Sequence, residues 1–192
     1  MENVVLQDRT IEEMCVNSAL RDRRIFLNEE IDRESIFKLT YWLDKLENID
    51  KKMGKKEPIE IVIDSYGGSV YHTLSAISKM QSMIDKGYEI ITTCHSTAFS
   101  GAFMILIAGS KRRAYRNSRL MVHNISFVTG GKHQDIIEDV EETEALWERL
   151  KEIITDRTLI QEKRLEEIKK FKYDWYFWGD EAMKYQIVDE II

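Results

Sequence analysis

Residues 59–70 read IEIVIDSYGGSV, an apolar run that leads through two glycines into an amphipathic stretch. The β-branched residues of Ile59–Ile63 predict a buried strand that stops at the motif DSYGGS. A helix is predicted next, because apolar residues recur at helical spacing: Val70, Leu74, Ile77 and Ile84. Gly87 follows as its C-terminal stop. A strand, a glycine turn and a helix in this order predict an α/β unit.

The same alternation extends outward on both sides of this stretch. Further strands are predicted at Arg24–Leu27, Glu89–Cys94, Arg119–His123 and Gln186–Asp189. Further helices are predicted after an N-cap at Asp32, in the apolar run ending at Ala108, and over Gln134–Thr155, Gln161–Phe171 and Glu181–Tyr185. The longest of these helices carries an aligned apolar set: Ile136, Val140, Trp147, Leu150 and Ile154. Alternating strands and helices predict an α/β fold of repeated right-handed βαβ units.

The composition is that of one globular domain. A chain of 192 residues with 43% hydrophobic and 32% charged residues can build its own core and is not a disordered chain. Its single proline and nine glycines favour regular elements joined by compact turns. Because residues 1–22 are polar with scattered apolar positions, we expect an N-terminal arm over 1–22 and a folded domain over 23–192.

Charge and cysteine content exclude several classes of function. The net charge of −6 argues against nucleic acid as the main partner. The two cysteines, Cys15 and Cys94, form neither a disulfide framework nor a zinc motif, and no nucleotide-binding glycine motif is present. We therefore expect no metal and no cofactor. The N-terminus is too acidic for a signal peptide, and the apolar run Ala102–Ala108 is too short to span a membrane, so we expect a cytoplasmic protein.

Two segments between strands and helices are rich in glycine and small residues: DSYGGS and HSTAFSGAF. Ligands of α/β folds bind where strands end and helices begin, and small residues allow the backbone to approach a ligand closely. These two loops therefore predict a site. Gly67 and Gly68 are interpreted as a tight turn or as one wall of an oxyanion hole, because no phosphate-loop lysine follows them.

Ser100, His123 and Asp174 are the candidate chemical groups. Ser100 precedes Gly101 at a strand-to-helix junction, where a capping serine is the simpler interpretation on this observation alone. His123 ends an apolar strand, and a lone histidine there is more often a core residue with a satisfied partner. Asp174 lies between two aromatic residues. Serine, histidine and aspartate together would supply a nucleophile, a base and a group that orients the base, although chemistry alone leaves this open.

Five ordered blocks resemble the proteolytic subunit of the Clp protease family. They are RRIFLNEEID, IDSYGGSV, STAFSGAF, NSRLMVH and YDWYFWGDEAMKYQIVDEI, and they span about Arg24–Ile192. The sequence departs from the family's pattern at several places. Among them, Tyr66 replaces a proline, Phe99 replaces a small residue, and NISFVTGG follows His123 in place of the usual segment.

The resemblance implies a crotonase-like fold with a protruding handle helix, a peptidase domain over 23–192 and a handle region at about 124–160. It implies that Ser100 is the nucleophile, that His123 is the general base and that Asp174 orients it. The backbone N–H groups of Gly68 and Gly101 would form the oxyanion hole, and no cofactor is implied. The expected activity is that of a serine endopeptidase acting on polypeptide substrates.

The resemblance also implies partners and leaves alternatives. It implies homo-oligomeric, seven-membered rings stacked in pairs, and a possible Clp-type AAA+ ATPase that delivers substrates. The alternatives are a phage-type head-maturation protease, a catalytically weak or inactive ring subunit, and an enzyme of the same superfold that acts on acyl-CoA thioesters.

Overall fold

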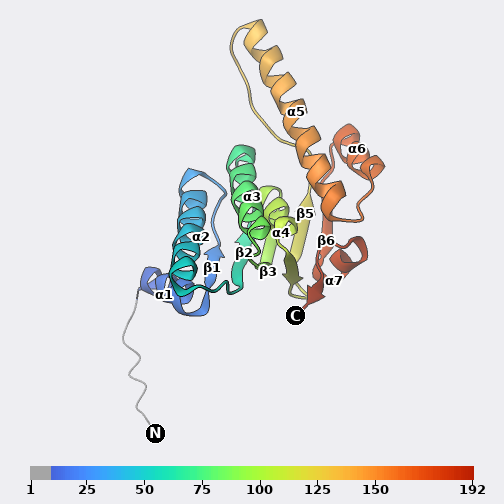
Figure 1. Ribbon diagram of the computed structural model, residues 1–192. Coiled ribbons are helices and arrows are strands. Elements are labelled where there is room, and N and C mark those ends of the chain that lie inside the picture. The colour runs from blue at the N-terminus through green and yellow to red at the C-terminus, as the bar shows by residue number, and fades with distance from the viewer. Residues whose placement is uncertain (1–9) are drawn as a thin grey trace.

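The structure, a computed structural model, describes residues 10–192 (Figure 1). Its helices are α1 (Ile11–Asn17), η1 (Ser18–Asp22), α2 (Arg33–Met53), α3 (Val70–Asp85), α4 (Gly101–Ala108), α5 (His133–Arg157), α6 (Glu162–Phe171), α7 (Gly179–Ala182) and η2 (Met183–Tyr185). Its strands are β1 (Arg24–Leu27), β2 (Ile59–Ser65), β3 (Ile90–Phe99), β4 (Lys111–Ala114), β5 (Arg119–Val122), β6 (Trp175–Trp178) and β7 (Glu190–Ile191).

The strands form one sheet in the order β1-β2-β3-β4-β7, and β5 and β6 extend it from the far end of β3. All pairs are parallel except β5 with β6. Figure 1 shows α2, α3 and α4 lined up over one face of the sheet. The α/β fold expected from the alternation of strands and helices is confirmed, and the parallel pairs are those that helical crossovers produce.

On the edge opposite β2, β3 pairs with two strands in turn, and this fork positions the site. Its first part, Ile91–Cys94, pairs with β4, whereas Thr97–Phe99 pairs with β5. The sequence-based expectation that the strand ends at Cys94 and that HSTAF is a loop is therefore wrong. Because β5 supplies a pairing partner beyond the end of β4, the chain stays extended up to Phe99 and Ser100 follows directly.

α2 and α4 behave as their sequences predict. Asp32 caps α2, with its carboxylate accepting a hydrogen bond from the Ser35 N–H at 2.8 Å. The apolar residues of α2 that recur at helical spacing are buried: Ile36, Leu39, Leu43 and Leu46. α4 has the sequence GAFMILIA and is buried on every side, as its continuous apolar run requires. Trp147, Phe103 and Phe177 are the largest side chains in the surrounding core.

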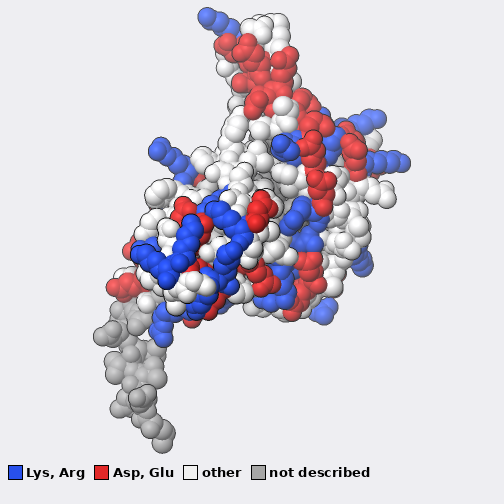
Figure 2. Space-filling view, viewed as in Figure 1, with Lys and Arg blue, Asp and Glu red and all other residues white. Residues whose placement is uncertain are grey.

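The predicted faces of two helices need correction. α3 packs against both α2 and α4, so its fully buried positions are Thr73, Ala76, Met80 and Met83 rather than the predicted set, which is only partly buried. α5 leaves the body along its N-terminal half, as Figure 1 shows. Ile136 and Val140 are consequently exposed, whereas Trp147, Leu150 and Ile154 are buried. Figure 2 shows acidic side chains gathered along the protruding part of α5.

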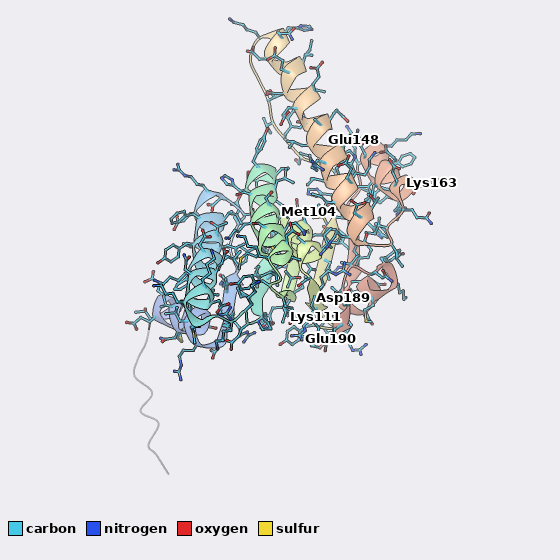
Figure 3. All side chains as sticks on the ribbon, in the orientation of Figure 1. Met104, Lys111, Glu148, Lys163, Asp189 and Glu190 are labelled. Carbon is cyan, nitrogen blue, oxygen red and sulfur yellow. The ribbon has the colours of Figure 1, made fainter. Side chains whose placement is uncertain are left out.

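The C-terminal elements also differ from expectation. The strand expected at Gln186–Asp189 lies further on, as β7, which pairs with β4. Asp189 stays outside the strand because its carboxylate accepts hydrogen bonds from the main-chain N–H and the guanidinium of Arg112. Figure 3 shows Lys111 beside Glu190, and Lys111 Nζ lies 3.1 Å from Glu190 Oε2.

The last helix begins two residues earlier than Glu181. The Glu181 carboxylate accepts a hydrogen bond from the Trp178 N–H at 2.8 Å, which makes Glu181 the third helical residue of α7. A 3₁₀ turn, η2, then continues to Tyr185. β4 and β6 are not among the predicted strands, and their strand pairing depends on neighbours that are distant in sequence.

Residues 1–9 of the expected N-terminal arm lie outside the described residues. The rest of it is helical: Thr10 forms a capping box with Glu13 at the start of α1, and η1 ends at Arg23 in a left-handed conformation. Within residues 10–192, no helix combines the length and apolar character that a bilayer crossing requires.

Candidate active site

The glycine turn after β2 packs against the segment that precedes α2. Gly67 and Gly68 have positive φ values of +95° and +151°. A Cβ at Gly67 would lie 2.6 Å from the Phe99 carbonyl oxygen, and one at Gly68 would lie 2.3 Å from the Ile31 carbonyl oxygen. The Ile31 N–H donates to the Gly67 carbonyl and the Ser69 N–H donates to the Ile31 carbonyl, each at 2.8 Å. At positions 67 and 68, only glycine fits both the backbone conformation and the available space.

Ser100 occupies a strained turn between β3 and α4. Its φ of 54° and ψ of −121° are unusual for a residue with a side chain. The turn is held by the Ser100 N–H, which donates to the Met121 carbonyl at 2.9 Å. At the next position, a Cβ on Gly101 would lie 2.4 Å from Thr73 Oγ1. The Ser100 side chain makes no capping hydrogen bond, so the simpler interpretation as a helix cap is wrong.

The structure brings Ser100, His123 and Asp174 together. Ser100 Oγ lies 2.8 Å from His123 Nε2. His123 Nδ1 lies 3.6 Å from Asp174 Oδ1, which is ion-pair distance but too long for a hydrogen bond. These residues lie at the end of β3, just after β5 and just before β6, so the pairing of three strands sets their spacing.

Burial decides the charge of His123. Desolvation lowers the pKa of the imidazole below its ordinary value, and the Asp174 carboxylate opposes this by favouring the cation. The His123 side chain is 25% exposed and that of Asp174 is 48% exposed, so solvent weakens the attraction between them. A lowered pKa leaves the imidazole neutral near pH 7, the form in which it can accept a proton.

Two backbone donors lie beside Ser100. Within residues 10–192, neither the Gly68 N–H nor the Gly101 N–H donates a hydrogen bond to another group. Gly101 is the first residue of α4, where a helix leaves its N–H groups without internal partners. Free amide donors next to a hydroxyl are suited to stabilising a developing oxyanion.

A cavity of about 210 Å³ opens beside Ser100. Its lining is mostly apolar and comes from the glycine turn, α3, α4, β5, the segment after β5, and α5. The residues that line it include Val70, Thr73, Met104, Met121, Ile125, Trp147, Leu150 and Ile154. Figure 3 shows Met104 near the centre of the body. A cavity of this size and character accepts one apolar side chain of a bound chain.

Sequence reasoning missed the contribution of α3 and α5 to this cavity. Thr73 carries no motif, yet its hydroxyl donates to the Ser69 carbonyl at 2.9 Å and its Oγ1 packs over Gly101. The helical spacing of Trp147 predicts only a core residue. The sequence offered no clear signal for Thr73, because its burial follows from the packing of α3 against α2 and α4.

Three other side chains of nucleophile or base type, Cys94, His95 and His133, do not line the cavity. Cys94 is buried, and burial raises the pKa of its thiol to about 12, so it is not a nucleophile. His95, on the opposite side of the strand, is exposed and packs edge-on against Tyr115. His133 is exposed at the start of α5. No group of three metal-binding side chains occurs in the described part of the chain.

The family model described as Clp protease matches residues 8–192. Proteolytic subunit 1 of the ATP-dependent Clp protease from Prochlorococcus marinus subsp. pastoris is 33% identical over 176 residues, covering 90% of this chain and 85% of that protein. Subunit 2 from a Synechococcus species and the proteolytic subunit from Bacteroides fragilis are each 31% identical, with 90% of this chain covered and 84% and 80% of theirs. The chain belongs to the Clp protease family.

Proposed function

We propose that this member of the Clp protease family is a serine endopeptidase, the proteolytic subunit of an ATP-dependent Clp protease, with Ser100 as nucleophile, His123 as general base and Asp174 as the residue that orients the base. The observation that carries the proposal is the 2.8 Å contact between Ser100 Oγ and His123 Nε2. It occurs at a strained turn, where a mere capping serine would use its hydroxyl on the helix.

The geometry supports acyl transfer in two halves. When the proton of the neutral imidazole lies on Nδ1, Nε2 accepts the Ser100 hydroxyl proton while Oγ forms a bond to the substrate carbonyl carbon. The imidazolium then donates that proton to the leaving amine as the C–N bond breaks. Water then attacks the acyl carbon while Nε2 accepts a proton from it. The imidazolium returns that proton to Ser100 Oγ as the bond between Oγ and the acyl carbon breaks. In both halves, the Asp174 carboxylate favours the positively charged imidazolium of His123.

The tetrahedral intermediate places a negative charge on the substrate oxygen. The N–H groups of Gly68 and Gly101 are the donors proposed for it, because both are free and both residues line the same cavity as Ser100. The side chain on the acyl side of the scissile bond enters the cavity lined by Val70 and Trp147. The substrate backbone lies along Asn124–Ser126, which line part of the cavity.

Replacement of the nucleophile tests this function. Ser100→Ala is expected to abolish labelling by a fluorophosphonate probe and to lower peptide cleavage by about 10⁴- to 10⁶-fold, because no other group can form the acyl intermediate. Ser96→Ala is the matched control, since Ser96 is an exposed serine on β3, the strand that leads to Ser100. Both measurements use the intact protein and a fluorogenic peptide. Equal labelling of the two variants would disprove the assignment.

We further propose a cytoplasmic homo-oligomer of seven-membered rings stacked in pairs, supplied by a Clp-type AAA+ ATPase. The protruding half of α5, the proposed handle, exposes Ile136, Ile137 and Val140 away from the body. A contact between rings would cover such residues. Native mass spectrometry should give a multiple of seven chains, and Ile137→Glu with Val140→Glu should separate the rings. A monomer at working concentration would contradict this assembly.

One observation favours a second candidate, a catalytically weak ring subunit. The 3.6 Å separation between His123 Nδ1 and Asp174 Oδ1 leaves the base without a hydrogen-bonded orienting group. Peptide cleavage by the purified chain, measured with and without an added Clp ATPase, separates the two candidates. A chain that is labelled by the probe but cleaves nothing in either condition would be the weak subunit.

A further inference from the structure

The pleat of β3, β5 and β6 sorts their side chains onto two faces. Neighbouring residues on a strand point to opposite sides, so each strand contributes alternate residues to each face. Ala98, Leu120 and Phe177 occupy one face and are at most 1% exposed, as part of the core. In register beside them, the other face carries three pairs from the three strands: Thr97 and Phe99, Arg119 and Met121, and Tyr176 and Trp178.

This second face, with Tyr66 added from the glycine turn, forms a continuous aromatic surface. The ring centroids of Tyr66 and Phe99 lie 5.5 Å apart, and those of Phe99 and Tyr176 lie 5.6 Å apart. The Arg119 guanidinium lies 5.2 Å from the Tyr176 ring centroid and 4.3 Å from that of Trp178. We call Tyr66, Phe99, Arg119, Tyr176 and Trp178 the aromatic face.

The aromatic face is exposed although its members are large. Tyr66 is 76% exposed, Tyr176 is 41% exposed and Trp178 is 49% exposed. Exposed aromatic side chains contribute little to the stability of the fold. A contiguous exposed apolar surface marks a place where another molecule binds. Within the described residues Arg119 forms no ion pair, so its charge is also available to a ligand.

The aromatic face is continuous with the candidate active site. Phe99 directly precedes Ser100, Tyr66 lines the cavity, and the Tyr176 hydroxyl lies 3.5 Å from Asp174 Oδ2. The paired residues Trp178 and Arg119 lie two residues further along their strands from Ser100 than the paired residues Tyr176 and Met121. Two residues span about 7 Å at the usual rise of a strand. An extended peptide covers that distance in two residues.

We propose that the aromatic face binds the polypeptide substrate outside the residue whose side chain fills the cavity, and that it selects segments with an aromatic or large aliphatic side chain two to four residues from the scissile bond. This inference rests on the proposed function, because it names a further part of the same substrate's binding surface. Aromatic side chains pack on exposed rings in edge-on or offset arrangements. A lysine at the same place is disfavoured, since it would meet the Arg119 cation.

A peptide series tests the proposal. Fluorogenic peptides share one residue for the cavity and carry Phe, Gly or Lys at positions two to four on either side of the scissile bond. In the wild-type protein, Phe at one of these positions should raise kcat/KM by about three- to tenfold over Gly, the usual contribution of one aromatic contact. Trp178→Ala should remove this preference.

Two controls make the result specific. Phe37→Ala removes an aromatic residue that is 68% exposed on α2, and it should leave both kcat/KM and the preference for Phe unchanged. Fluorophosphonate labelling of Ser100 follows the catalytic groups without using the aromatic face. If the wild type is not labelled, the proposed function fails. If labelling is normal in all three proteins but no position prefers Phe, only the aromatic-face proposal fails.

Other outcomes also overturn the proposal. A preference for Phe that survives in Trp178→Ala would assign it to another surface. An altered oligomeric state in Trp178→Ala with the preference intact would assign the aromatic face to a contact between copies of the chain. Native mass spectrometry of the same variant records that outcome.

Discussion

The two sides of the Ser100–His123 pair are built differently. On one side, the glycine turn and Ser100 are held by close contacts that only residues without a Cβ allow. A side chain at Gly67, Gly68 or Gly101 would clash with its neighbours. On the other side, Asp174 is 48% exposed and lies 3.6 Å from the imidazole. The position of Ser100, the proposed nucleophile, is therefore set by the packing of the body, whereas that of the Asp174 carboxylate, the proposed orienting group, depends on weaker surface contacts. The site can consequently adjust on the Asp174 side without disturbing the core.

Of the changes compared on the two sides of the Ser100–His123 pair, the largest loss of kcat is expected at the glycine turn. Gly68→Ala places a Cβ 2.3 Å from the Ile31 carbonyl oxygen in a left-handed conformation, so the turn must shift and its N–H must move away from the substrate oxygen. We expect kcat to fall by about 10³-fold, the upper end for one lost oxyanion donor. Steady-state assays with the fluorogenic peptide measure it.

Gly130→Ala is the matched control, because nothing lies within 4 Å of the position that its new methyl group would occupy and its φ lies outside the left-handed region. It should retain wild-type kcat. Circular dichroism and labelling separate a local effect of Gly68→Ala from failure to fold. Equal activities of the two alanine variants would show that the glycine turn does not contribute to catalysis.

A smaller loss of kcat is expected on the side of Asp174. Asp174→Asn keeps the shape of the side chain but removes the charge that favours the imidazolium. A buried orienting aspartate is worth about 10⁴-fold in kcat, and we expect about 10²-fold here, because the distance is long and solvent screens the pair. A loss equal to that of Ser100→Ala would show that Asp174 moves to a tighter contact during the reaction.

The smallest effect is a shift in pH dependence. Because burial lowers the pKa of His123, kcat/KM of the wild type should fall with acid only below the ordinary histidine value of about 6.5. Asp174 raises that pKa, so Asp174→Asn should lower it further and move the acidic limb to lower pH. Rate profiles of both proteins between about pH 5 and 8 measure the shift. A limb that moves to higher pH would contradict the geometry of the pair.

Much of the fold could be predicted from local pattern. The capped start of α2 at Asp32, the apolar run of α4 and the short strands around the glycine turn all depend on neighbours in sequence. The prediction that Ser100, His123 and Asp174 belong to one site needed the resemblance to a family. The residues alone favoured a helix cap and a core histidine, because local chemistry does not report which distant groups meet.

Side-chain type and spacing were enough to predict the alternation of strands and helices and the two glycine-rich junctions, and they offered Ser100, His123 and Asp174 only as candidates. Tertiary contacts were needed to establish that β3 continues to Phe99 and forks between β4 and β5. They also account for the contribution of Thr73 to the cavity and for the exposure of Tyr176 and Trp178. Strand pairing and helix packing join residues far apart in the chain, and no local pattern encodes which partner will be present.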